Sequence, residues 1–316
     1  TYYLAGEINM VDNTIPPNMA MGGTGVPMGQ PQVNPLKKHL RQPKIYIKLP
    51  SSGKYWPQNS IEVPESGEFP VYAMTARDEI TFKTPDALLN GQATVDVIQS
   101  CMPNIKNAWV CPSIDLDTIL VAIRMATYGE TIDVTAAVPN TNIKREFGYG
   151  LQSIYDHLLS AQFEDTHKID GFTITIKPTT YKTQTEQAVK AFEEQRVFAI
   201  IDNDELDNTV KLERFQKAYA KLTEININVL IDSVVAIKPD GDQDAVTNPA
   251  YIHDFLDNCD ASIFNQISDC IKAQKKKYTI KPITVSATEE ELKAGAPETF
   301  EVPVTFDQSN FFGSGS

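Results

Sequence analysis

The strongest hydrophobic pattern in the chain lies between residues 113 and 129, where large apolar side chains recur at the three- and four-residue spacing of a helix. The apolar positions are Leu116, Ile119, Leu120, Ile123 and Ala126. Asp115 and Asp117 stand near the start, where carboxylates suit the positive end of a helix, and Gly129 follows the last apolar position. The pattern therefore predicts one helix that stops at Gly129.

Apolar periodicity and capping residues predict further helices. Thr84, Pro85 and Asp86 form a strong helix start, and Gly91 interrupts that helix as a C-terminal cap or a kink. Three successive amphipathic helices with short joints, expected to pack as antiparallel neighbours, are predicted over residues 185–201, 206–222 and 225–237. The remaining predicted helices are 151–161, 249–256 and 261–271.

Strands are predicted where apolar and polar residues alternate between turn residues. The segments 45–49 and 69–72 are expected to pair as a small sheet, and 172–177 is expected to form a hairpin with 163–168. The remaining predicted strands are 131–137, 278–285 and 300–306. Gly148-Tyr149-Gly150 is interpreted as a turn, because the further glycines and the lysine of a phosphate-binding loop are missing.

Together these elements predict an α+β fold that is mainly helical, with small antiparallel sheets near both ends and an extended N-terminal arm. A chain of 316 residues with 41% hydrophobic content can bury one large core or two moderate ones. The predicted parts are a partner-binding arm over 1–42, an α+β lobe over 43–147, a helical lobe with a β-hairpin over 148–277, and a C-terminal β segment with a Phe-Phe tail over 278–316.

The first forty or so residues differ in composition from the rest, since prolines and glycines deny them regular structure. Four of the seven methionines lie there: Met10, Met19, Met21 and Met28. Methionines interleaved with glycine make an adaptable apolar ribbon that can lie along the groove of a neighbour. We favour a partner-binding arm that orders on assembly, and a plain flexible tail is the alternative.

Aromatic residues supply the other candidate contacts with partners. Trp56 lies near a turn and is either an interface anchor or a cover for the apolar face of its own sheet. Phe311 and Phe312 precede a glycine- and serine-rich tip. They suit a plug for a neighbour's pocket, and packing back on their own domain is the alternative.

Charge and hydropathy limit the classes of partner. A formal net charge of −13 argues against nucleic acid, because phosphate binding requires clustered lysines and arginines. No stretch approaches the roughly 20 apolar residues of a membrane helix, and the start of the chain lacks the pattern of a secretory signal. We therefore expect a soluble protein without a membrane partner, made in a cytoplasm or built into a particle assembled there.

No metal, cofactor or catalytic motif is recognisable. The four cysteines are Cys101, Cys111, Cys259 and Cys270. They lie outside the Cys-x-x-Cys spacing of structural zinc sites, so buried reduced thiols are expected. The four histidines are far apart, and the elbow, phosphate-loop and zinc-helix motifs of common enzymes are missing. We predict that the chain is not an enzyme.

The three acidic residues of the segment 240–244 resemble the start of a calcium loop. Ala245 stands where such a loop needs glycine for its sharp turn, and Tyr251 stands where a bidentate carboxylate must close the cage. A solvated acidic loop is the better interpretation.

Five sequence segments of the chain resemble those of a known family. They are Leu49–Tyr55, Met74–Glu79, Thr84–Gly91, Ala122–Gly129 and Phe306–Gly313. Together they resemble the baseplate hub proteins of contractile-tailed, T-even-like bacteriophages, over roughly residues 45 to 316. Some members of the resembled family carry cysteine pairs near the positions of Val138–Asn140 and Ser286–Thr288. This chain has none there, so a zinc ribbon is not carried over.

The resemblance implies a structural subunit in the virion, at the tail baseplate, assembled in the host cytoplasm. Its implied partners are other baseplate subunits, with the tape-measure protein as a further candidate, in a symmetric assembly of multiple copies. Two alternatives stay open. One is a transient assembly factor of the hub or a chaperone of the tape-measure protein. The other is a cell-wall hydrolase, because two catalytic carboxylates need no sequence signature.

Overall fold

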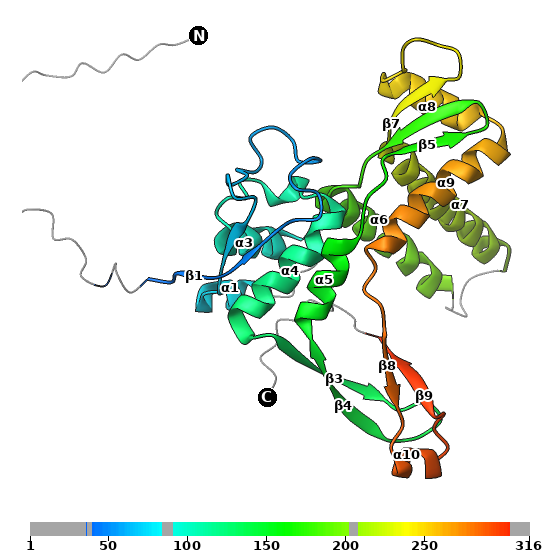
Figure 1. Ribbon diagram of the computed structural model, residues 1–316. Helices are drawn as coiled ribbons and strands as arrows, with labels where there is room; N and C mark the ends of the chain where they lie inside the picture. Colours follow the sequence, from blue (N-terminus) through cyan, green and yellow to red (C-terminus); the bar gives the residue numbers. More distant parts are fainter. Residues whose placement is uncertain (1–35, 37–39, 84–90, 202–207, 304–316) are drawn as a thin grey trace, which may run out of the picture. The chain divides into compact units, whose positions relative to one another are not determined.

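The computed structural model describes residues 36, 40–83, 91–201 and 208–303, with the backbone alone for 193–201, 208, 214 and 226 (Figure 1). The chain divides into two compact units, Thr1–Leu40 and Arg41–Ser316, and the elements below belong to the second. The predicted α+β class is confirmed: helices dominate, and small antiparallel sheets occur in the middle of the chain as well as near its ends. The predicted arm lies almost entirely outside the described residues.

Helix α4 (Ser113–Tyr128) forms the centre of the largest core, and most of its residues are buried. It begins after Pro112 and ends at Gly129, whose φ of 97° is one that L side chains rarely adopt. Helices α3 (Gln92–Cys101) and α5 (Leu151–Ser160) pack against it. The predicted helix from Leu116 to Gly129 is confirmed, and α5 lies where a helix over 151–161 is predicted.

Strands β1 (Pro43–Ile47) and β2 (Phe69–Tyr72) pair antiparallel beside α4, as predicted. Helix α1 (Ala76–Lys83) follows, and α3 begins directly after Gly91. The helix predicted to start at Thr84 lies outside the described residues, and α3 itself was not predicted.

Arg41 joins the start of the second unit to these elements. Its guanidinium donates to the carbonyl oxygen of Ala73 at 2.7 Å and to the hydroxyl of Ser100 at 2.8 Å, and it lies 3.4 Å from the carboxylate of Asp78. Asp78 in turn accepts from the backbone N–H of Thr75 at 2.7 Å. Because guanidinium and carboxylate are both hydrogen-bonded, this partly buried pair keeps β1 against α1 and α3.

Asp115, fully buried in the first turn of α4, holds the preceding loop onto the helix. Its carboxylate accepts from the backbone N–H of Ser51 and from the indole N–H of Trp56, both at 2.8 Å, and also from the hydroxyl of Ser51. Burial raises the pKa of Asp115, and the bonds from Ser51 and Trp56 act in the opposite direction.

The interpretation of Trp56 as an interface anchor is corrected by this arrangement. Trp56 is only 8% exposed, and its ring belongs to the same core as α4. Its indole N–H is already occupied by Asp115, so the alternative of an internal cover holds.

Strands β3 (Thr131–Ala137) and β4 (Lys144–Gly150) form an antiparallel hairpin, in which Ile132 pairs with Tyr149. β3 is confirmed as predicted. The interpretation of Gly148-Tyr149-Gly150 as a turn was wrong, because these residues close the second strand. A Cβ at Gly148 would lie 3.3 Å from the carboxylate oxygen of Asp133 on the paired strand, so glycine leaves room for that side chain.

A three-stranded sheet carries a second core. It consists of β5 (Thr166–Ile169), β6 (Phe172–Ile176) and β7 (Val234–Pro239), in the order β5-β6-β7. The predicted hairpin of the first two is confirmed, with positive φ at both turn residues, Asp170 and Gly171. Helices α8 (Pro249–Asn258) and α9 (Ala261–Lys277) supply side chains to the same core.

Helices α6 (Tyr181–Ile201) and α7 (Asn208–Ser233) pack against each other as a helical hairpin. The prediction of three successive helices was wrong in its last part. No helix breaker separates Leu222 from Ile225, so α7 continues to Ser233, and the β-branched run that follows becomes β7.

Strands β8 (Ile283–Ser286) and β9 (Thr299–Val302) with helix α10 (Glu289–Lys293) join the β3–β4 hairpin around a third, small core. Arg145 lies 2.8 Å from the carboxylate of Glu291, and its guanidinium stands 4.4 Å over the ring of Phe147. The backbone N–H of Thr288 lowers the pKa of Glu291, and Arg145 acts in the same direction.

Replacing Asp115 tests how much of the fold depends on its carboxylate. Asp115→Asn turns an amide N–H₂ toward at least one donor, so we expect the free energy of unfolding to fall by about 1–3 kcal/mol in urea titrations followed by circular dichroism. The control is Asp244→Asn, an exposed carboxylate, expected to change stability by less than about 0.5 kcal/mol. Equal effects of the two substitutions would contradict the role given to Asp115.

Candidate docking surface

The α6–α7 helical hairpin exposes a group of large apolar side chains, which we call the hairpin patch. Its members are Val189, Phe192, Val210, Leu212, Phe215 and Tyr219. They are between 37% and 63% exposed. The other exposed large apolar residues described in the second unit each stand on a different element or loop, as Tyr46, Ile80 and Tyr251 do. Exposed apolar side chains gathered on one pair of helices are typical of interaction sites, whereas single scattered residues are ordinary.

Helical geometry explains how the patch forms. Leu212, Phe215 and Tyr219 follow one another at spacings of three and four residues, so they lie on one face of α7. The rings of Phe215 and Tyr219 stack with centroids 6.4 Å apart and planes inclined by 11°. Ala218 and Ile225, by contrast, are buried. The apolar surface of α7 is therefore wider than the face that its own fold covers.

A groove continues the patch along α6. Its volume is about 860 Å³, and it lies between α6 and the short 3-10 helix η2 (Ala108–Val110). Trp109 is half-buried there, and its ring stacks on that of Tyr181 with centroids 5.7 Å apart. The backbone N–H of Tyr181 donates to the carbonyl oxygen of Cys111 at 2.8 Å, which fixes α6 beside η2. Val189 lines the groove and belongs to the hairpin patch, so the two surfaces are continuous.

Two ion pairs lie along the hairpin. Lys182 and Glu186 approach to 3.8 Å, and Lys221 and Glu224 approach to 3.1 Å, each pair within one turn of its helix. Exposed pairs of this kind contribute little stability, about 0.3–0.5 kcal/mol each.

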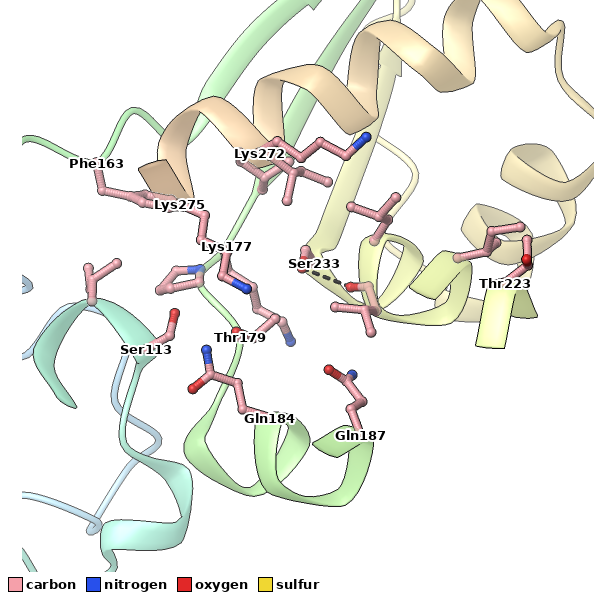
Figure 2. Close-up of a pocket in the computed structure, with 17 residues that line it drawn as sticks. Ser113, Phe163, Lys177, Thr179, Gln184, Gln187, Thr223, Ser233, Lys272 and Lys275 are labelled. Atoms are coloured by element: carbon pink, nitrogen blue, oxygen red, sulfur yellow. Dashed lines mark hydrogen bonds between the residues drawn. The ribbon is translucent and has the colours of Figure 1, made fainter. Parts of the chain in front are cut away.

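A second hollow, which we call the central cavity, has a volume of about 460 Å³. Its apolar walls come from α4, β6, α7 and α9, through residues such as Ile114, Ile176, Leu230 and Ile271. The charged residues of its lining are lysines. They are Lys177, Lys272 and Lys275. Figure 2 shows Lys177 and Lys275 extending toward the amides of Gln184 and Gln187.

A smaller cavity of about 190 Å³ adjoins it and shares Ser113, Ile114, Gln184 and Lys275 with its lining. Asp117 lies there, half-buried on α4. Burial raises the pKa of Asp117 to about 6. Burial likewise raises the pKa of Tyr278, in the same lining, to about 12.

The other residues chosen from the sequence for partner contacts lie outside the described residues. They are Met10, Met19, Met21, Met28, Phe311 and Phe312. Their contacts with partners stay a prediction.

Trp109 was missed by the sequence reasoning, although it is the tryptophan that lines a groove. Nothing in the sequence separates it from Trp56, since both stand in short loops between apolar elements. The difference arises from tertiary contacts alone: one ring is covered by its own core, and the other stacks on the start of α6.

The metal-ligating and nucleophilic side chains of the described residues bear on the question of catalysis. The described residues contain no group of three or more His, Cys, Asp or Glu side chains that could hold a metal ion. Burial raises the pKa of Cys101 to about 12, so its thiol stays protonated and weakly nucleophilic at neutral pH, and Cys111 is raised in the same direction. His253 approaches Asp257 to 2.8 Å, and both side chains are about half exposed on α8.

Within the described ranges, none of the helices is long and apolar enough to cross a bilayer.

A comparison with protein families identifies a matching family. The model of a family described as T4 bacteriophage base plate protein matches residues 42–300 of the chain. The matched part includes the α6–α7 hairpin, the groove beside Trp109 and the central cavity. No curated protein and no solved structure matches the chain.

The raised pKa of Asp117 predicts a pH dependence of stability. The folded carboxyl has a pKa of about 6 against an ordinary 3.8, so between these values the folded state binds more protons than the unfolded state. Stability due to this group therefore falls as pH rises from 4 to above 6. Asn does not titrate, so the variant Asp117→Asn lacks this loss of stability. We expect the difference in free energy of unfolding, variant minus wild type, to increase by about 1–3 kcal/mol between pH 4 and pH 7.

Urea titrations at pH 4, 5, 6 and 7 measure this difference, and the exposed substitution Asp244→Asn tests whether loss of any one negative charge has the same effect. A constant difference between Asp117→Asn and wild type across this range would show that the carboxyl titrates normally.

Proposed function

Because the chain belongs to the family of T4 bacteriophage base plate proteins, we propose that it is a structural subunit of the hub region of a contractile tail baseplate. It acts by docking on other baseplate subunits and remains in the virion tail. Family membership supports the structural role and the place in the tail. The hub position rests on the resemblance of five sequence segments to those of hub proteins.

The hairpin patch is the observation that carries the docking mechanism. Six large apolar side chains of two adjacent helices are at least 37% exposed, and exposed apolar side chains gathered in this way are typical of interaction surfaces. Aromatic residues dominate the binding energy of many interfaces, and the patch contains Phe192, Phe215 and Tyr219. The adjoining groove adds Trp109 at its wall, which suits a partner side chain inserted between α6 and η2.

The expected partners are other baseplate proteins, present with this chain in multiple copies, and the tape-measure protein is a further candidate. Assembly takes place in the host cytoplasm. A transient assembly factor would use the same kind of surface and then leave. Quantitative mass spectrometry of purified mature tails separates the two: a fixed number of copies per tail supports a retained subunit, and absence from mature tails contradicts it.

The hairpin patch can be tested by polar substitution. The double variant Leu212→Gln and Tyr219→Gln changes residues that are 58% and 63% exposed, so its stability stays within about 1 kcal/mol of wild type. We expect its incorporation into tails to fall at least tenfold when variant and wild-type chains compete during assembly, which corresponds to about 1.4 kcal/mol or more of lost binding free energy.

The matched control is Tyr251→Gln on α8, which is 67% exposed but stands apart from the patch, and which should enter tails like wild type. Normal incorporation of a folded double variant would rule out the hairpin patch as the docking surface.

The arm gives an independent prediction. Deletion of residues 1–40 leaves Arg41 with its partners Ala73, Asp78 and Ser100, so the second unit keeps its fold and its thermal unfolding midpoint. We expect the truncated chain to be lost from purified tails, because the methionine-rich arm is proposed to bind a neighbour on assembly.

The matched variant changes the four methionines of the arm to serine while keeping its length. Incorporation of both altered chains at normal levels would exclude a role of the arm in docking.

A further inference from the structure

We infer that the central cavity is a binding site for a segment of a partner protein that carries a carboxylate next to apolar side chains. The inference deepens the proposed function, and it rests on that function for the identity of the partner. The site itself follows from the lining of the cavity, which combines apolar walls with positive charge.

The walls can hold apolar side chains. Ile114 on α4, Ile176 on β6, Leu230 on α7 and Ile271 on α9 come from four elements that are far apart in sequence. A hollow of about 460 Å³ lies within the usual size range of ligand sites in proteins, roughly 300–1,000 Å³. The enclosing elements therefore form a site before any partner arrives.

The charge of the lining is unusual for this chain. The formal net charge is −13, yet the seventeen residues that line the cavity include three lysines and no aspartate or glutamate. Within the parts that the structure describes, no carboxylate lies within 4.0 Å of Lys177, Lys272 or Lys275. The lining of the smaller, adjoining cavity includes an acidic residue, Asp117, but Asp117 forms no ion pair with Lys275.

Other lysines of the second unit do form ion pairs with carboxylates. Lys54 pairs with Asp165 at 2.6 Å, and Lys277, two residues after Lys275, pairs with Glu164 at 2.9 Å. Lys177 and Lys275 instead extend into the cavity toward Gln184 and Gln187 (Figure 2). A carboxylate accepts hydrogen bonds from ammonium and amide N–H groups. The apolar walls reduce the screening of these charge interactions by water.

A partner carboxylate would thus gain ionic hydrogen bonds in the cavity, while its apolar neighbours on the partner chain would be removed from water. The elements that present the lysines and amides include α6, whose other residues carry part of the hairpin patch.

Cross-linking in purified tails tests the occupant. A carbodiimide joins an amine to a carboxylate only when the two are in direct contact. We expect Lys177 or Lys275 to be joined to a carboxylate of another baseplate protein, whereas Lys168, an exposed lysine on β5, remains unlinked. The inference is overturned if Lys177 and Lys275 remain unlinked in tails and as open to acetylation as in the isolated chain.

Dye binding to the isolated chain tests the cavity without any partner. The probe is the anionic dye 8-anilinonaphthalene-1-sulfonate, and its uncharged counterpart N-phenyl-1-naphthylamine controls for apolar binding alone. The double variant Lys177→Gln and Lys275→Gln should bind the anionic dye about tenfold more weakly and the uncharged dye unchanged. Lys168→Gln should bind both like wild type. Equal affinity of wild type and the double variant for the anionic dye overturns the inference.

The cross-linking and dye-binding experiments together separate this inference from the proposed function. If mature tails lack the chain, the proposed function fails, and the dye titration still decides the site. If tails contain the chain but Lys177 and Lys275 are neither cross-linked nor protected from acetylation there, the site fails and the proposed function stands.

Discussion

A carboxylate buried in the largest core organises the first half of the folded unit. Asp115 is fully buried in the first turn of α4, and removal of a charge from water costs free energy unless hydrogen bonds replace the lost hydration. Ser51 and Trp56 supply those bonds from a single loop. If the loop moved away from α4, the carboxylate of Asp115 would lose these hydrogen bonds while its apolar surroundings remained. The helix, the loop and the strands beside it are therefore held together.

This constraint also decides which side chains remain for partners. The loop places Trp56 inside the core, and α4 is covered on most of its surface. The α6–α7 hairpin packs mainly as a helix pair, so its apolar faces extend beyond what its own fold can bury. A closed core with one incompletely covered hairpin suits the docking role proposed above, and the structural role of the family supports that proposal.

Local patterns predicted local elements well and long-range contacts poorly. α4, the β1–β2 pair and the β5–β6 hairpin could be predicted because periodicity, caps and turn residues act within a few positions of one another. The position of Trp109 beside a groove and the burial of Trp56 in the core could not be predicted, since both depend on elements that are distant in sequence. The same holds for the end of α7, where pairing of Ile237 with Ile174 of β6 favours a strand over further helix.

The most direct test of this account is a reconstruction of the purified tail at a resolution that traces this chain. The account predicts that a neighbouring baseplate protein covers Leu212, Phe215 and Tyr219, while Asp115 keeps its bonds to Ser51 and Trp56 in the interior. A tail in which the hairpin faces solvent, and the chain contacts its neighbours through other surfaces, would contradict it.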